Sequence, residues 1–239
     1  MNELVAGIDL CDEYTQVNCN DEENTWTFPT VLCRHKVSGT WSVGEDAYAQ
    51  TLRGEGSLTD KLVKLVLKEG TATLEGIRYT AVELLERFLE RVLWQVKKNL
   101  GTEAGFQELV FTVRSLDERL TEALYSCGEK LGVDRARIRI IGHTEGLIYY
   151  MLSQKKEIWS GNVGLFDLSE QELRYYEMKV QRGLKQNAVL AEFERIEESF
   201  SLDILETPSG AKLGDKILCT CAERLMQRKL YSAVFLMGK

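Results

Sequence analysis

The sequence predicts an α/β fold arranged in two lobes. Two segments share one design, in which an apolar strand ends in an aspartate and is followed by a polar turn and a second strand: residues 4–20, with Asp9, and residues 162–180, with Asp167. Between them, residues 108–141 read as strand, helix and strand with short connections, which predicts parallel strands joined by a right-handed crossover. The pair of related hairpins indicates two lobes that face a cleft.

The elements after the first hairpin follow from local composition. Pro29 cannot donate to a sheet ladder, so we expect its strand at a sheet edge or strand start. Gly and Ser residues at 53–59 indicate a loop. In chain order we expect a strand at 26–33, a strand and short helix at 41–50, a helix at 61–68 and a hairpin at 72–79.

The clearest helix is expected from Thr80 to about Leu100. Thr80 and Glu83 form a capping-box pattern, and Gly101 is a typical stop. An apolar stripe with helical spacing predicts that this helix packs against a sheet or another helix. The stripe consists of Val82, Leu85, Phe88, Leu89, Val92, Leu93 and Val96.

The remaining elements complete the βαβ unit and the second lobe. The last expected strand, at 233–237, is followed only by Gly238 and Lys239, so we expect the second lobe to be incomplete at its C-terminus. The expected elements are a helix at 115–132, a strand at 138–141, a helix at 144–152, the second hairpin, a strand near 188–195, an extended piece near 202–205 and a helix at about 215–230.

Charge and hydropathy exclude some classes of function. A net charge of −7 argues against a general surface for nucleic acid or anionic membrane, because Lys and Arg dominate such contacts. No apolar run approaches the roughly 20 residues that span a bilayer, and the N-terminus lacks the pattern of a secretion signal. We expect a cytoplasmic protein.

The six cysteines are dispersed, and they resemble small buried side chains more than a disulfide framework. Cys11, Cys19, Cys33 and His35 could in principle gather a metal, but no Cys-x-x-Cys pair is present and we do not expect zinc. We interpret His143, at the start of a helix, as a capping or surface residue.

Several short motifs in this order resemble the ATPase domain of the actin, sugar kinase and heat-shock chaperone superfamily, and most closely DnaK-like chaperones. Gly7-Ile-Asp-Leu-Cys-Asp-Glu13 is similar to the family's opening Gly-Ile-Asp-Leu-Gly-Thr-Thr. Residues 139–147 resemble its Arg-Ile-Ile-Asn-Glu-Pro-Thr-Ala-Ala, and Leu165-Phe-Asp-Leu168 its Val-Phe-Asp-Leu. Val234-Phe-Leu-Met-Gly238 resembles its closing adenosine-binding strand.

The resemblance implies a ribonuclease H-like, two-lobe actin-like ATPase fold, with a mixed sheet and flanking helices in each lobe. We expect the first lobe at residues 1–158, with a small insertion at about 40–101. The second lobe is expected at 159–239, truncated or minimal.

The resemblance also implies metal and catalytic roles. Asp9 and Asp167 would face magnesium through water. Lys61 would reach toward the terminal phosphate, and Glu145 would lie near the attacking water, if the ATPase is active. The alternative for both aspartates is structural, because an aspartate at a strand end can bond the turn backbone.

The same resemblance implies nucleotide-binding positions. Cys11, Asp12 and Glu13 would form the first phosphate loop, Ser169 would lie in the second, and Gly238 would approach the adenosine. Glycines normally let the backbone N–H groups of such loops reach phosphate, and neither turn contains one.

These rewritten loops favour a degenerate, non-catalytic protein that acts as an interaction or assembly scaffold. We expect a protein partner or self-assembly, no nucleic acid, no membrane and no cofactor. The alternative is a working ATPase of the same fold that binds ATP and Mg, with lobe closure driven by nucleotide. A sugar kinase relative is a weaker third class, because nothing marks a sugar pocket.

Overall fold

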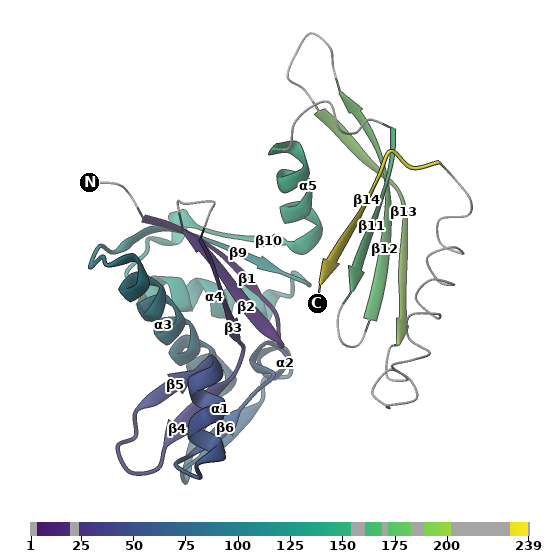
Figure 1. Cartoon of the computed structure of the whole chain (residues 1–239). Helices are drawn as coiled ribbons and strands as arrows, with labels where there is room; N and C mark the ends of the chain where they lie inside the picture. Colours follow the sequence, from purple (N-terminus) through teal and green to yellow (C-terminus); the bar gives the residue numbers. More distant parts are fainter. Residues whose placement is uncertain are drawn as a thin grey trace. The chain divides into compact units, whose positions relative to one another are not determined.

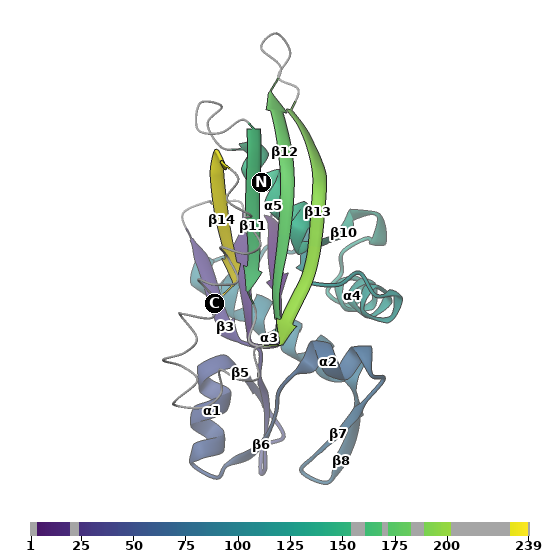
Figure 2. The same cartoon turned by 90° about the vertical axis from the view of Figure 1, so that its right-hand side faces the viewer.

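The computed structural model describes residues 4–19, 24–153, 161–168, 172–182, 189–201 and 230–238. Contacts divide the chain into two compact units, Met1–Leu147 and Ile148–Lys239, and each is described by itself. Several β-sheets with flanking helices make up the protein (Figures 1 and 2). The α/β class predicted from the sequence is therefore confirmed.

The first unit is built on a five-stranded sheet in the order β10-β9-β1-β2-β3. Strands β1, β9 and β10 are parallel, whereas β2 and β3 continue from β1 as an antiparallel meander. Pro29 ends β3, the edge strand, as the sequence predicted. The strands are β1 (Leu4–Leu10), β2 (Tyr14–Cys19), β3 (Thr25–Pro29), β9 (Phe106–Val113) and β10 (Ile138–Gly142).

Helices α3 and α4 pack on this sheet, α1 packs mainly on neighbouring strands, and α5 spans the boundary between the two units. The predicted capping box is present at the start of α3, where Thr80 and Glu83 bond each other's backbone N–H, and Gly101 ends the helix at φ 64°. The helices are α1 (Gly44–Leu52), α2 (Leu62–Leu67), α3 (Ala81–Leu100), α4 (Glu118–Lys130), the 3₁₀ turn η1 (Arg135–Arg137) and α5 (His143–Ser153).

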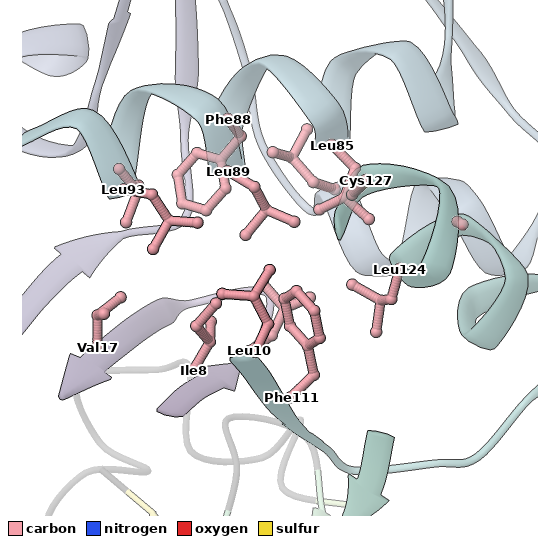
Figure 3. Close-up of a cluster of buried hydrophobic side chains, with 14 of the residues drawn as sticks. Ile8, Leu10, Val17, Leu85, Phe88, Leu89, Leu93, Phe111, Leu124 and Cys127 are labelled. Atoms are coloured by element: carbon pink, nitrogen blue, oxygen red, sulfur yellow. The ribbon is translucent and has the colours of Figure 1, made fainter. Parts of the chain in front are cut away.

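The hydrophobic core of the first unit lies between the sheet and helices α3 and α4 (Figure 3). Phe88 and Leu89 of α3 face Ile8 and Leu10 of β1, and all four side chains are buried. Each such side chain contributes about 1.5–3 kcal/mol on burial. The stripe predicted for α3 is buried as expected, except that Val82 is only partly buried.

Two small sheets accompany the main sheet of the first unit. One has the order β5-β4-β6, with β4 (Leu32–His35), β5 (Trp41–Val43) and β6 (Gly56–Thr59), and the other pairs β7 (Thr71–Leu74) with β8 (Ile77–Thr80).

Two predictions in this region are wrong. The single strand expected at 26–33 is broken after Pro29, where the Val31 N–H bonds the Pro29 carbonyl and the buried Thr30 hydroxyl bonds Thr15. The loop expected at 53–59 ends in strand β6. Gly56 pairs with His35 of β4 in this strand, and the position requires a glycine because a Cβ there would lie 2.5 Å from the Arg34 carbonyl oxygen.

The second unit contains a four-stranded sheet in the order β13-β12-β11-β14. Its core includes the buried side chains of Tyr175 and Glu177, and Tyr231 donates a hydrogen bond to the Glu177 carboxylate. The extended piece and helix expected at 202–230 lie almost wholly outside the described residues. The strands are β11 (Gly161–Leu168), β12 (Glu172–Arg182), β13 (Val189–Ser201) and β14 (Ala233–Gly238).

Four strands of the first unit's main sheet, all except β10, have the same topology as the four-stranded sheet of the second unit. In each, a first strand pairs with an antiparallel second strand on one side and with a parallel later strand on the other, and the third strand pairs with the second. Asp9 and Asp167 each occupy the second-to-last position of the first strand. Among the described residues, no helix has the length and apolar character needed to cross a membrane.

Candidate functional site

The carboxyl ends of the three parallel strands of the first unit meet at one edge of the sheet. Asp9 of β1 lies opposite Thr112 of β9, and Thr112 lies opposite Ile141 of β10. The chain then enters α5 at His143, directly after β10. In open α/β sheets, ligands bind outside the carboxyl ends of parallel strands, so we expect a ligand site at this edge.

Asp9 and His143 form the centre of this edge. The His143 Nε2 atom lies 2.8 Å from Asp9 Oδ1, and the Thr112 hydroxyl donates to the same oxygen at 2.8 Å. The His143 side chain is 11% exposed and that of Asp9 46% exposed. Burial raises the pKa of Asp9, but the hydrogen bonds from His143 and Thr112, with the positive charges of His143 and Arg114, outweigh it and hold this pKa below its usual value.

Cys11, in the turn after β1, completes a cluster with these two residues. Its Sγ atom lies 3.8 Å from His143 Nε2, and the ligand atoms of Asp9, Cys11 and His143 all lie within 4.8 Å of one another. In a nucleophile–histidine–carboxylate triad, the two ring nitrogens contact different partners. Here Asp9 and Cys11 both face the same nitrogen, so the cluster is a convergent set of ligand atoms and not a proton relay.

Asp12 has a structural task in the same turn. Its carboxylate accepts hydrogen bonds from the Val63 N–H at 2.8 Å and the Lys64 N–H at 3.2 Å, the second and third residues of α2. Asp12 therefore caps this helix from a distant part of the chain, in place of Lys61, whose side chain makes no cap and whose φ is 52°. Burial is the largest influence on Asp12 and raises its pKa, in spite of these bonds.

Two backbone groups of the turn at Cys11–Glu13 bond within the protein. The Cys11 N–H donates to the Tyr14 carbonyl at 3.2 Å, and the Glu13 carbonyl accepts from the Thr30 N–H at 2.9 Å. The Asp12 carboxylate is already bonded to α2, and the turn contains no glycine that would bring further N–H groups toward a phosphate. In these partners and in its lack of glycine, the turn differs from a glycine-rich phosphate loop.

The other residues that the sequence singled out are separate from this cluster or lie in the second unit. Glu145 is exposed in the first turn of α5. Asp167 lies in β11, in register with Arg174 and Met237, and Gly238 ends β14 beside Leu168. Ser169 lies outside the described residues. That Asp9 and Asp167 face each other across a cleft stays a prediction.

The structure separates the residues that the sequence offered as possible metal ligands. Cys19 and Cys33 are buried, and burial raises the pKa of the Cys19 thiol to about 11. His35 Nδ1 accepts from the backbone N–H groups of Val37 and Ser38, both at 3.1 Å, and so stabilises a turn. Of this set, only Cys11 belongs to the cluster.

Thr112 is the cluster residue that the sequence did not single out, and His143 was singled out only as a capping or surface residue. The interpretation of His143 as a capping or surface residue was wrong, because its side chain is mostly buried against Asp9 and Cys11. A signal was present: a histidine directly after a parallel strand lies at the edge where such sheets bind ligands.

A model of a protein family matches residues 13–239, and its description is a family of unknown function (DUF5716), C-terminal. The match covers most of the chain and begins just after Asp9 and Cys11. A search of curated proteins found no match to the chain.

Proposed function

The chain belongs to the family of unknown function DUF5716, whose C-terminal model it matches. We propose that it is a degenerate actin-like or chaperone-ATPase-like protein that acts as a non-catalytic interaction or assembly scaffold. Under this proposal the two units correspond to the two lobes of the actin-like fold. The shared topology of their main sheets, with Asp9 and Asp167 at equivalent strand positions, supports the correspondence.

The turn after β1 is the observation that supports a protein without nucleotide chemistry. Phosphoryl transfer depends on positioning and charge neutralisation by backbone donors and metal ions. In this turn the Asp12 carboxylate caps α2 and the Cys11 N–H closes the turn itself. Asp9 is bonded to His143 and Thr112. The Asp12 carboxylate and the Cys11 N–H therefore have partners within the protein, and Asp9 faces a histidine, which supports a site that is not built for a nucleotide.

An interaction role is supported by the exposed side of the second unit. Strand β14 lies at the end of its sheet as described, and it exposes the side chains of Val234 and Leu236, the latter to 81%. Edge strands with apolar side chains are common sites of association with another chain. A protein partner or a second copy of this chain is therefore the expected ligand of the scaffold.

Calorimetric titration of Mg-ATP into the whole chain, together with its melting temperature, tests the loss of nucleotide binding. We expect no heat of binding and no shift. The alternative is a functional ATP-binding protein, and at about 5 mM nucleotide a Kd of about 100 μM would add about 2 kcal/mol of stability. A saturable shift of that size would refute the degenerate assignment.

Sedimentation velocity over a range of concentrations tests self-assembly through β14. Leu236→Glu places a charge on the exposed face of this edge strand, and Leu52→Glu is the matched control, because Leu52 is 87% exposed on α1. We expect association that Leu236→Glu weakens and Leu52→Glu leaves unchanged. Equal effects of the two variants would argue against β14 as the contact.

A further inference from the structure

Three ligand atoms of different chemical character converge at the edge of the first sheet. They are a carboxylate oxygen of Asp9, a thiol sulfur of Cys11 and an imidazole nitrogen of His143, separated by no more than 4.8 Å. Asp9 lies in β1, and His143 is the first residue of α5. Two of the three side chains therefore project from regular elements, whose backbone holds them in place.

The spacing of these atoms is close to that of a tetrahedral zinc site. With bond lengths of about 2.3 Å to sulfur and about 2.0–2.1 Å to nitrogen and oxygen, neighbouring ligand atoms lie about 3.3–3.6 Å apart. The Asp9 Oδ1 to His143 Nε2 distance of 2.8 Å would open by about half an ångström, and the Cys11 Sγ to His143 Nε2 distance of 3.8 Å would close slightly. The Asp9 and Cys11 ligand atoms lie within 4.8 Å of each other and would close by at most about 1.3 Å, through rotation of the Cys11 side chain.

The ligand types decide which ion fits. Magnesium and calcium prefer oxygen ligands, whereas thiolate and imidazole select zinc and similar transition-metal ions. Three protein ligands leave a fourth position for water or a substrate atom, as in catalytic zinc sites. The Thr112 hydroxyl, bonded to Asp9 Oδ1 at 2.8 Å, would orient the carboxylate, which is the usual task of an outer-shell partner.

We infer that Asp9, Cys11 and His143 bind one zinc-type divalent ion. This site lies beyond the scaffold role and uses none of the nucleotide chemistry. The competing interpretation is a plain Asp9–His143 ion pair with Cys11 as a neighbour. The two differ in whether the thiol and the imidazole bind the same ion.

Cobalt(II) titrated into the reduced, chelator-treated whole chain, without nucleotide, is the direct test. We expect one equivalent to bind, with a near-ultraviolet thiolate-to-cobalt charge-transfer band and the strong visible absorption of tetrahedral cobalt, both removed by zinc. Cys11→Ser and His143→Asn each remove one proposed ligand. Each variant should lose the charge-transfer band, or should bind cobalt more weakly by a factor larger than the 10–100-fold that is typical when an outer-shell partner is lost.

The sequence supplies matched controls. It contains two histidines, so His35→Asn tests the other one, and Cys19→Ala removes a buried thiol outside the cluster. Both variants should bind cobalt as the wild type does. Circular dichroism and metal-free melting establish that each variant is folded, and zinc should raise the melting temperature of the wild type but not of Cys11→Ser.

Absence of the charge-transfer band in the wild type would overturn the inference, as would a band that Cys11→Ser or His143→Asn leaves unchanged. Because the titration contains no ATP, its outcome is independent of the nucleotide experiment.

Discussion

His143 Nε2 lies 2.8 Å from Asp9 Oδ1. The two residues are far apart in the sequence. They meet because β9 lies between β1 and β10, and all three strands run parallel to one another and end at the same sheet edge. Thr112, on the middle strand, donates to the same carboxylate oxygen. Strands β1 and β9 thus contribute Asp9 and Thr112 to this contact, and β10 leads directly into His143.

Thr112→Val should weaken cobalt binding by about 10–100-fold without removing the charge-transfer band, because it deletes an outer-shell hydrogen bond and keeps all three ligands. Thr112→Ser retains the hydroxyl and should bind nearly as the wild type does. The measurement is the cobalt titration followed by absorbance. Equal affinities of the valine variant and the wild type would show that the hydroxyl does not orient Asp9.

Asp12→Ala should destabilise the protein by about 0.5–2 kcal/mol, since the N–H groups of Val63 and Lys64 lose their cap. Asp12→Asn keeps a side-chain oxygen at this position and should cost much less. Urea unfolding of the two variants against wild type gives both values. Similar losses for Ala and Asn would mean that charge, and not the cap, makes Asp12 stabilising.

The buried hydroxyls of Thr15 and Thr30 bond each other at 2.9 Å, and both side chains are fully buried. Thr15→Val or Thr30→Val alone should cost about 1–3 kcal/mol, because each leaves one buried hydroxyl without its partner. The double variant should be nearly neutral, since it removes both polar groups. A double-mutant cycle by urea unfolding measures this, and additive losses would contradict the explanation.

Gly128 allows α4 to approach β10 closely, since a Cβ there would lie 2.5 Å from Ile138 Cδ1. Gly128→Ala should destabilise the protein by about 1–3 kcal/mol through overpacking. Adding Ile138→Val removes the clashing methyl group and should recover part of that loss. Gly105→Ala is the control, because nothing lies within 4 Å of its Cβ position, and it should change stability by no more than about 0.5 kcal/mol.

The capping box at the start of α3 should make stability depend on pH through Glu83. The hydrogen bond from the Thr80 backbone N–H, with a second from its hydroxyl, holds the pKa of Glu83 below its usual 4.5. A lowered pKa in the folded state adds stability above the unfolded pKa, and this contribution is lost as pH falls through the folded value.

Melting temperatures of the wild type and Glu83→Gln, measured from about pH 6 to about pH 3, test this dependence. The wild type should be the more stable at the upper end, and the difference should shrink as Glu83 becomes protonated. Glu90→Gln, on the exposed side of the same helix, is a control that lacks the capping bonds. A difference that stays constant with pH would exclude the capping carboxylate as its source.

Local patterns in the sequence predicted most of the regular elements. The capping box at Thr80, the apolar stripe of α3 and the hairpin around Gly76 depend on residues a few positions apart, and the structure contains all three. The strand at 26–33 was predicted too long, because the turn at Thr30 depends on a hydroxyl bond to a neighbouring strand. Gly56 was assigned to a loop, because its close neighbour Arg34 lies on another strand.

By itself, the sequence determined the α/β class, the two related hairpins and a first turn that contains Cys11, Asp12 and Glu13 and no glycine. Only the tertiary structure decided what those residues do. Asp12 caps a helix that begins far along the chain, and Cys11 and Asp9 meet His143 at the sheet edge. Periodicity and turn composition report neighbours along the chain, whereas these contacts arise from the order in which strands pair, which no local pattern encodes.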